Sequence, residues 1–515
     1  MSVTTAPLAF RLPRTAEVPA RQRVLLPALI YCGLCLALIS SLGVLLIPTI
    51  ASAQHVSLAS AEWVLTINLL VGAVSTPVLG RIADGPHPRR VLVFMLCSVL
   101  TGSLVAATAV SMPQLLFGRA LQGLCYGIIP ITITLARRHL PAHDVGRGVA
   151  ALSVTAATGL GLGYPFTGIV AEHLDYRVAF WVAAGFSASA LCLVPYAVPG
   201  STPVERRDSP IVGWLLRSAA LGSGVVVPGG PVAAPAPEHS KHSGGSFDVV
   251  GTVLLALGLS SLLIGLSESP EWGWGSAKVL GLLVAAVLVF AGWAWWELRA
   301  AAPLVRLDLL RNPEVAVANM AAVGLGVSMF IGFAAVGQLA QTPHSTGYGL
   351  GLTVFMAGVV ITPLSIGSQI ASRVAAVLTR RLGVRPLLML GAVFVIVASS
   401  MLALRHDRLW ELLVAMTLFG FGIGSTFAAM PTLIIQSVPV GQVGSATSFN
   451  QVLRTIGGSI GSAITGAVLA MQVKNGFPVD SDYRNTFAIS AFLCALLLIA
   501  LLFDAARARR RSSVA

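Results

Sequence analysis

Two arginines stand inside long apolar stretches of this sequence, where a charge is hardest to solvate. Arg119 follows the start of an apolar run at residue 113, and Arg454 lies within the run 446–472. A guanidinium that leaves water is stable only when it is partnered or hydrated. Both arginines are therefore candidates for function.

Uncharged polar side chains accompany them. Gln122 lies one helical turn after Arg119, and Asn450 lies one turn before Arg454. Asn68 and Gln338 stand in two other apolar stretches. Such groups could orient a bound molecule by hydrogen bonds.

Acidic side chains avoid the middle of the apolar stretches, although the chain has 20 of them. Proton transfer needs a group whose pKa lets it load and unload. The best candidate is Glu62, beside Trp63, if an apolar setting raises its pKa. The alternative is an ordinary acid at the boundary of the apolar stretch.

A short basic loop follows the apolar stretch 61–81. It places Gly80 and Asp84 ahead of Arg89 and Arg90. The Asp84 carboxylate can accept hydrogen bonds from the start of a neighbouring helix, or pair with one of the two arginines. The arginines could also be simple anchors at a membrane surface.

Glycines recur at helical spacing in two places. Gly159, Gly163 and Gly168 flank Pro165, and Gly457 and Gly461 repeat the spacing of the first pair. Small residues let helices approach closely, and a proline allows a bend. These residues predict tight helix packing and say little about a ligand.

No catalytic chemistry follows from the other residue patterns. The chain shows no cluster of nucleophile, acid and base, no metal-ligand spacing and no nucleotide-binding loop. Cys32 and Cys35 imitate a redox pair but lie in an apolar stretch, where packing is the better interpretation. We expect no enzyme, no metal and no cofactor.

The composition places these residues in a membrane protein. Of 515 residues, 56% are hydrophobic and 10% are charged, whereas a soluble domain carries roughly 25% charged residues. Apolar stretches long enough to span a bilayer as helices occur fourteen times. We place them at 25–51, 61–81, 90–110, 113–137, 148–171, 177–197, 248–268, 277–297, 315–340, 349–372, 386–404, 410–436, 446–472 and 485–504.

The basic residues define an orientation. With the N-terminus inside, 25 of the 33 Lys and Arg fall in cytoplasmic segments and 6 in outside loops. This bias predicts that both termini are cytoplasmic. It also assigns the net charge of +13 to membrane orientation and not to nucleic-acid binding.

Two segments of the chain can be interpreted in two ways. The first apolar stretch is too long for a signal peptide, so we expect an uncleaved first span. The Pro/Gly-rich segment 200–247 contains an apolar patch at 211–227, interrupted by Arg217. If that patch spanned, the charge bias of every later loop would invert, so we expect a linker with a helix at the membrane surface.

The sequence contains an internal repeat. A shift of 298 residues superimposes Pro141 on Pro439, Gly159 on Gly457 and Gly163 on Gly461. Two like halves are therefore expected. The predicted parts are a cytoplasmic tail (1–24), a six-helix half (25–199), a cytoplasmic linker (200–247), an inserted helix pair (248–298), a second six-helix half (299–505) and a basic cytoplasmic tail (506–515).

Fourteen spans, two like halves and an inserted pair, together with these motifs, resemble the major facilitator superfamily, specifically its 14-helix drug:proton antiporter branch. The resemblance covers essentially the whole chain. It implies an all-α membrane fold, in which the Gly80, Asp84, Arg89, Arg90 cluster latches one conformation. It also implies an antiporter packing motif at Gly159–Gly168, and roles in coupling or substrate orientation for Arg119 and in cavity lining or gating for Arg454.

The sequence departs from this family at two points. The usual central glycine of the loop is His87, followed by Pro88. The acid that the branch usually places in the first span is replaced by Ile39, which cannot titrate. Proton coupling would therefore need a titratable group elsewhere in the chain.

We expect a monomeric exporter of small, mainly apolar organic compounds in the cell membrane, with a proton gradient as one energy source. Its cavity would be lined by Asn68, Arg119, Gln122, Gln338, Asn450 and Arg454, with Glu62 as the candidate for coupling. One alternative is a dedicated exporter or uniporter of one metabolite or lipid without proton coupling. Another is a membrane sensor or scaffold that binds a partner through the linker. For Arg119 the alternative is a side chain that extends to the membrane surface, and for Arg454 it is a structural bond between helices.

Overall fold

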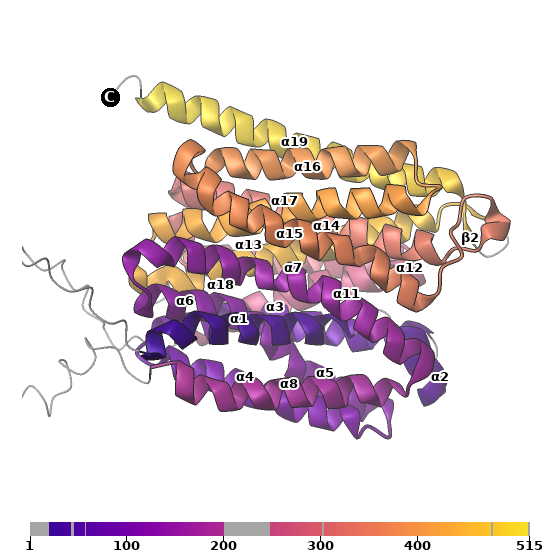
Figure 1. Cartoon of the computed structure of the whole chain (residues 1–515), viewed down its shortest axis with the longest axis horizontal. Helices are drawn as coiled ribbons and strands as arrows, with labels where there is room; N and C mark the ends of the chain where they lie inside the picture. The colour runs from indigo at the N-terminus through magenta and orange to yellow at the C-terminus, as the bar shows by residue number, and fades with distance from the viewer. Residues whose placement is uncertain are drawn as a thin grey trace, which may run out of the picture.

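The computed structural model describes residues 20–42, 46–56, 58–199, 248–300, 303–474 and 477–512. Long helices lie along one common direction and make up nearly all of this part (Figure 1). A two-stranded antiparallel hairpin, β1 (Val473–Lys474) and β2 (Phe477–Pro478), is the one sheet in it. The predicted surface helix at 211–227 and the linker around it lie outside the described residues.

The helices of the N-terminal half are α1 (Ala20–Ser41), α2 (Ile47–Gln54), α3 (Leu58–Asp84), α4 (Pro88–Ala107), α5 (Met112–Gly123), α6 (Ile128–His139), α7 (Ala142–His173) and α8 (Tyr176–Ala197). A 3₁₀ turn, η1 (Leu124–Gly127), joins α5 to α6. The helices α5 and α6 together therefore make one long segment.

The inserted pair is α11 (Val249–Ser267) and α13 (Ala277–Glu297), joined through α12 (Ser269–Trp272). The C-terminal half follows a 3₁₀ turn, η2 (Leu307–Arg311), and contains α14 (Pro313–Gln341), α15 (Val354–Leu382), α16 (Arg385–Leu404), α17 (Leu409–Ser437), α18 (Val443–Leu469) and α19 (Asp480–Ser512). Two more 3₁₀ turns, η3 (His344–Thr346) and η4 (Val440–Gln442), precede α15 and α18.

Thirteen helical segments in the described residues are long and apolar enough to cross a membrane. The helix α7 is not among the thirteen, although it covers the fifth predicted span, 148–171. The multi-pass architecture is therefore confirmed, and the count of fourteen stays a prediction.

Helix ends differ from the predicted span limits in several places. The first span was predicted to reach residue 51, but α1 ends at Ser41 and a separate helix α2 carries Pro48 in its first turn, a position that suits proline. The helix α15 begins at Val354 instead of 349, after Gly347 and Gly351 with positive φ. The helix α19 continues to Ser512, so most of the predicted basic tail is helical.

Helices of the two halves meet along two seams. In one, α7 packs on α15, and in the other α3 packs on α18. The inserted helix α11 packs on both α3 and α18. A small apolar cluster around Ala73, Leu259 and Val452 fills this junction. The inserted pair therefore covers one of the seams between the halves.

The two ends of the bundle differ in charge. The start of α1, the end of α19 and the chain entering and leaving the linker lie at one end (Figure 1). Arg81, Arg89, Arg137, Arg385 and Arg507 belong to helix ends on this side, which we call the arginine-rich end. The opposite end carries α2, α12 and the hairpin (Figure 1).

Candidate functional site

Arg119 is completely buried in α5. Its Nε donates to the Val64 carbonyl of α3 at 3.0 Å, and its Nη1 donates to Gln122 Oε1 at 2.8 Å and to the Ile39 carbonyl of α1 at 3.4 Å. The guanidinium therefore ties three helices together inside the N-terminal half. It does not extend to the membrane surface, which excludes the alternative considered from the sequence.

Gln122 continues this hydrogen-bonded chain toward α4. Its Nε2 donates to Ser103 Oγ at 2.8 Å, and Ser103 in turn donates to the Val99 carbonyl. No pattern in the sequence singles out Ser103, because a serine in an apolar helix ordinarily bonds its own backbone. Here its hydroxyl also orients the Gln122 amide.

Asn68 lies one turn after Val64 on α3 and is completely buried. Neither its side-chain oxygen nor its nitrogen has a hydrogen-bond partner among the described residues, and neither does Nη2 of Arg119. Buried polar groups are nearly always paired with protein, water or a ligand. The two residues therefore offer hydrogen-bonding capacity that the protein itself does not use.

Two other predicted residues stand apart. Gln338 is exposed near the end of α14, and its predicted place in the lining of a cavity stays a prediction. Glu62 belongs to the first turns of α3, but its side chain lies outside the described part of the structure.

Asn450 makes bonds within the C-terminal half. Its Nδ2 donates to the Ala318 carbonyl and to Asn319 Oδ1 of α14, each at 3.0 Å. Asn450 thus joins α18 to α14, and sequence reasoning missed its partner Asn319. Arg454 on the same helix donates to Gln451 Oε1 and lies 4.1 Å from the centre of the Phe427 ring of α17.

Asp84 closes the α3–α18 seam at the arginine-rich end. Its carboxylate accepts from the backbone N–H groups of Gly444 at 2.6 Å and Ser445 at 2.7 Å, at the start of α18. The positive end of the helix dipole favours a carboxylate there. Gly80 makes this approach possible, because a Cβ at that position would lie 2.7 Å from the Gly444 carbonyl oxygen.

The two arginines that follow Asp84 do not bind its carboxylate. Arg89 donates to the Pro195 carbonyl at 3.1 Å, and Arg90 is exposed. Arg138 of α6 instead donates to the carbonyl oxygens of Asp84 and Gly85 at 2.6 and 2.9 Å. Of the two alternatives for Asp84, the structure therefore shows the bonds to a helix start and not the pairing with Arg89 or Arg90.

Glu172, which the sequence analysis missed, closes the α7–α15 seam at the opposite end. Its Oε1 accepts from the Phe355 N–H in the first turn of α15 at 2.7 Å. This backbone bond lowers the pKa of the Glu172 carboxyl, which follows the apolar stretch 148–171. Gly168 permits the contact, because a Cβ there would lie 2.7 Å from Phe355 Cα.

The middle of the α7–α15 seam is hydrogen bonded as well. Gln369 Nε2 donates to Thr158 Oγ1 at 2.7 Å, and Ser365 donates to the Thr158 carbonyl at 3.1 Å. A carboxylate at each end and polar contacts between them thus connect the two halves across these seams.

The remaining predicted glycines pack within the halves. A Cβ at Gly159 or Gly163 would overlap Ala37 or Ser41 of α1, and one at Gly457 or Gly461 would overlap backbone of α14. The repeat is therefore visible in the packing, since α7 meets α1 as α18 meets α14. Pro165 lies inside α7 without interrupting it.

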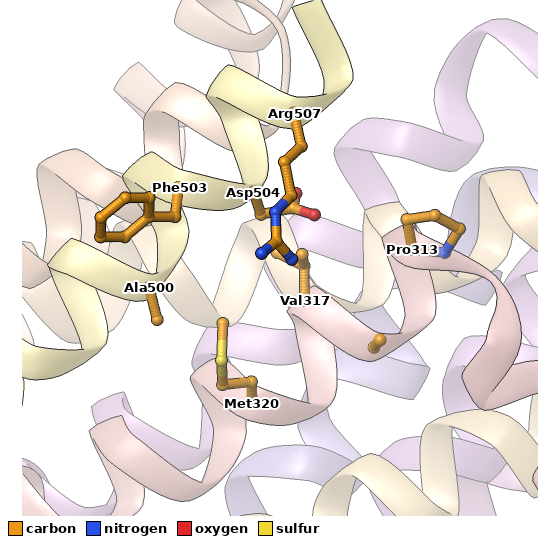
Figure 2. Close-up of a pocket in the computed structure, with 8 residues that line it drawn as sticks. Pro313, Val317, Met320, Ala500, Phe503, Asp504 and Arg507 are labelled. Carbon is orange, nitrogen blue, oxygen red and sulfur yellow. The ribbon is translucent and has the colours of Figure 1, made fainter. Parts of the chain in front are cut away.

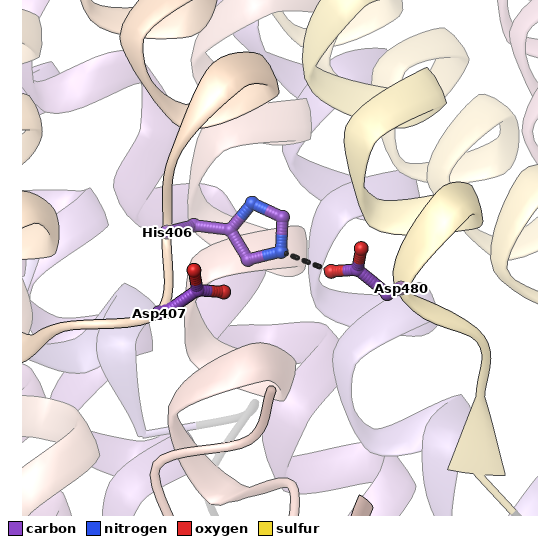
Figure 3. A group of neighbouring side chains, drawn as sticks. All are labelled: His406, Asp407 and Asp480. Carbon is purple, nitrogen blue, oxygen red and sulfur yellow. Dashed lines mark hydrogen bonds and ion pairs between the residues drawn. The ribbon is translucent and has the colours of Figure 1, made fainter. Parts of the chain in front are cut away.

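A separate group of His406, Asp407 and Asp480 lies near the hairpin (Figure 3). His406 is buried, and its ring nitrogens contact the Leu402 carbonyl at 2.7 Å and Asp480 Oδ1 at 2.8 Å. Arg484 pairs with the other Asp480 oxygen at 2.7 Å. Because both Asp480 oxygens are occupied by these cationic or donor groups, we interpret the cluster as a structural tie between α16 and α19.

Comparison with known proteins identifies the family to which this architecture belongs. The Major Facilitator Superfamily family model matches residues 29–363 and 316–514. The chain belongs to the major facilitator superfamily. It is therefore a multi-pass membrane protein of a transporter family and not an enzyme.

Relatives in this superfamily include drug-export proteins. An uncharacterised transporter of this type from Mycobacterium tuberculosis strain H37Rv is 28% identical over 475 residues, which is 90% of this chain and 62% of the relative. The chain therefore spans less than two thirds of that protein. The tetracenomycin C resistance and export protein of Streptomyces glaucescens is 28% identical over 459 residues, 86% of this chain and 75% of the relative. These relatives confirm the resemblance to the 14-helix drug:proton antiporter branch.

Solved structures of this superfamily share the fold. The human organic anion transporter MFSD10 (TETRAN) superimposes with a TM-score of 0.61 at 14% identity, covering 94% of this chain and 100% of that one. The nucleoside transporter NupG gives a TM-score of 0.53 at 15% identity, covering 94% and 98%. At such identities the comparison supports the fold alone.

Proposed function

We propose that this protein exports small, mainly apolar organic compounds by alternating access. The observation that carries the proposal is the pair of carboxylates at opposite ends of the seams: Asp84 bonds the start of α18, and Glu172 bonds the start of α15. Breaking one contact while keeping the other would open the bundle at one end only. That is the requirement of alternating access.

The unpaired groups of Asn68 and Arg119 are the proposed polar contacts for substrate. Both are completely buried in the N-terminal half. A substrate that is mainly apolar and carries one hydrogen-bond acceptor would satisfy them at low desolvation cost. The export proteins among the relatives support this class of substrate.

A second function, uniport or export of one compound without proton coupling, is favoured by one observation. Among the described residues, the hydrogen-bonded partners of Arg119 are Gln122 and two carbonyls, and none is an acid. Ile39 contributes a backbone carbonyl at the position where the family places an acid. A proton would therefore need another carrier, for which Glu62 remains the candidate.

Efflux from proteoliposomes tests both functions. We expect the wild-type protein to move dyes or antibiotics and the Arg119→Ala variant to lose most of this activity. Faster efflux under an imposed pH gradient, lost in Glu62→Gln, would support antiport. Efflux that ignores the gradient would support uniport. No efflux across a broad panel, together with unchanged drug accumulation after gene deletion, would overturn the export proposal.

The arrangement of the chain in the membrane is part of the proposal. The arginine-rich end is assigned to the cytoplasm, because basic loops are retained on that side. Both termini and the linker 200–247 would then be cytoplasmic, and one chain would be the transporting unit.

A further inference from the structure

A groove opens between α14 and α19 at the arginine-rich end (Figure 2). Its volume is about 500 Å³, and it belongs neither to the seams between the halves nor to the Arg119 cluster. Its walls include Val317, Met320, Ala500, Phe503, Asp504 and Arg507.

The groove has an apolar inner part and a charged mouth. The helices α14 and α19 run in opposite directions, so Met320 lies seven residues inward from Pro313, and Ala500 lies seven residues inward from Arg507. At 1.5 Å per residue this depth is about 10 Å. Met320 and Phe503 are 37% and 66% exposed, so the apolar part faces the surroundings of the protein.

Some of the charged side chains at the mouth have ion-pair partners in the described part of the chain, and one has none. Arg385 bridges Glu314 at 2.9 Å and Asp504 at 3.5 Å. Arg507 is exposed and has no ion pair among the described residues, and Figure 2 shows its side chain reaching over the groove. Because Arg385 pairs with both carboxylates at the mouth, the Arg507 guanidinium is the group there that can pair with a further anion.

We propose that this groove binds an anionic phospholipid of the membrane leaflet at the arginine-rich end. The phosphate would lie at Arg507, and one acyl chain would lie along Met320 and Phe503. A phospholipid presents a negative headgroup at the water boundary and hydrocarbon chains beneath it, in the same order as the groove. A mainly apolar transport substrate would leave Arg507 without a partner.

The purified protein can be titrated with lipid and followed by native mass spectrometry. The probes are palmitoyl-oleoyl phosphatidylglycerol and the phosphatidylcholine with the same chains. We expect tighter binding of phosphatidylglycerol by the wild type, and about five-fold weaker binding by Arg507→Gln, the loss of one cation near an anionic headgroup. Arg147→Gln, which removes an exposed arginine of α7 at the same end, should bind as the wild type does.

Two further arms complete the experiment. Met320→Trp places a larger side chain in the apolar part and should weaken both lipids, with folding checked by its melting temperature. Millimolar inorganic phosphate should not displace phosphatidylglycerol, because it offers no chain. Equal binding of the two lipids by the wild type, or unchanged phosphatidylglycerol binding by Arg507→Gln, would overturn the proposal. Loss of dye efflux in Met320→Trp with intact lipid binding would also overturn it, and would indicate a substrate entrance.

Discussion

At the scale of single residues, two buried asparagines behave in opposite ways. Asn450 bonds both the Ala318 carbonyl and Asn319, whereas Asn68 has no partner for either side-chain atom. An unpaired polar group loses its hydration on burial without compensation. Asn68 is therefore a residue that folding alone does not explain, which supports its assignment to substrate contact.

Replacing each asparagine by leucine separates the two roles. We expect Asn68→Leu to leave stability unchanged or raise it by up to about 1 kcal/mol, because an uncompensated polar group is removed. Asn450→Leu should cost about 1–3 kcal/mol, because it leaves the Ala318 carbonyl and Asn319 without a donor. Thermal unfolding in detergent measures both changes.

Transport by the Asn68→Leu variant tests whether Asn68 contacts the substrate. Asn68→Leu should lose efflux although it is folded, and this loss should depend on whether the substrate carries a hydrogen-bond acceptor. Full efflux by Asn68→Leu for every substrate would contradict the proposed contact.

Arg119 is a planar donor that reaches acceptors on three helices. A lysine keeps the charge but cannot reproduce this forked geometry. We expect Arg119→Lys to reduce efflux about ten-fold or more, and to destabilise the protein by about 1–3 kcal/mol as buried acceptors lose their donor. Proteoliposome efflux and thermal unfolding check this, with Arg147→Lys as the exposed control. Wild-type behaviour of Arg119→Lys would show that charge alone suffices.

At the scale of helices, glycine at a contact differs from glycine at a free surface. A Cβ at Gly461 would overlap the Val327 carbonyl and lie 3.0 Å from Val327 Cα, whereas a Cβ at Gly281 of α13 meets nothing within 4 Å. Gly461→Ala should therefore destabilise the protein by about 1–3 kcal/mol through overpacking. Gly281→Ala should be neutral or stabilise it by up to about 1 kcal/mol. Thermal unfolding distinguishes the two, and equal effects would show that α18 can move away from α14.

Removing the charge of either carboxylate at a helix start should open the bundle at the end where that carboxylate lies. Asp84→Asn should favour opening at the arginine-rich end, and Glu172→Gln should favour opening at the opposite end. A carboxylate at a helix start contributes about 0.3–1 kcal/mol when exposed and up to about 2 kcal/mol when partly buried. The larger shift is therefore expected for Asp84, which is buried. Distances between spin labels at each end measure these populations, and shifts of the same sign would refute the assignment.

The Glu172 contact also has an expected pH dependence. Its pKa is lowered by the Phe355 N–H, so the contact is fully present above the ordinary glutamate pKa and is lost as the pH falls through the lowered value. Glu172 should stay ionised at neutral pH. Spin-label distances at the opposite end should therefore be constant around neutrality and change only in acid, and Glu172→Gln should remove that change.

At the scale of the whole molecule, the internal repeat is seen in the packing of the helices but not in the positions of the two carboxylates. Shifting Asp84 and Glu172 by 298 residues leads to Leu382 and Ala470, neither of which can accept a hydrogen bond with its side chain. The N-terminal half supplies both carboxylates, and the C-terminal half supplies both helix starts. The two halves therefore have different roles in closing the molecule.

The number of spans makes a whole-molecule prediction. With α7 added to the thirteen qualifying segments the number is even, and both termini lie on one side. A C-terminal fusion should then be active as a cytoplasmic fluorescent protein and inactive as an alkaline phosphatase that needs export. The opposite result would show that one helix does not span, or that the patch 211–227 does.

The sequence by itself determined the fold class and the likeness of the two halves, because lipid forces helical spans and because glycine spacing reflects close packing. It also predicted that Asp84 could bind a helix start and that Arg119 was more than a surface charge. Each of these conclusions depends on local residue type and on distance along the chain.

Only the tertiary structure decided which distant groups meet. Hydrogen bonding joins Asp84 to residues 360 and 361 positions later, and Glu172 to one 183 positions later, which no local pattern encodes. It also separated the partnered Asn450 from the unpartnered Asn68, and it placed Arg138, not Arg89, against the Asp84 backbone. Spacing along the chain shows which side chains could bond, but the packing of helices across the two seams selects the pairs that do.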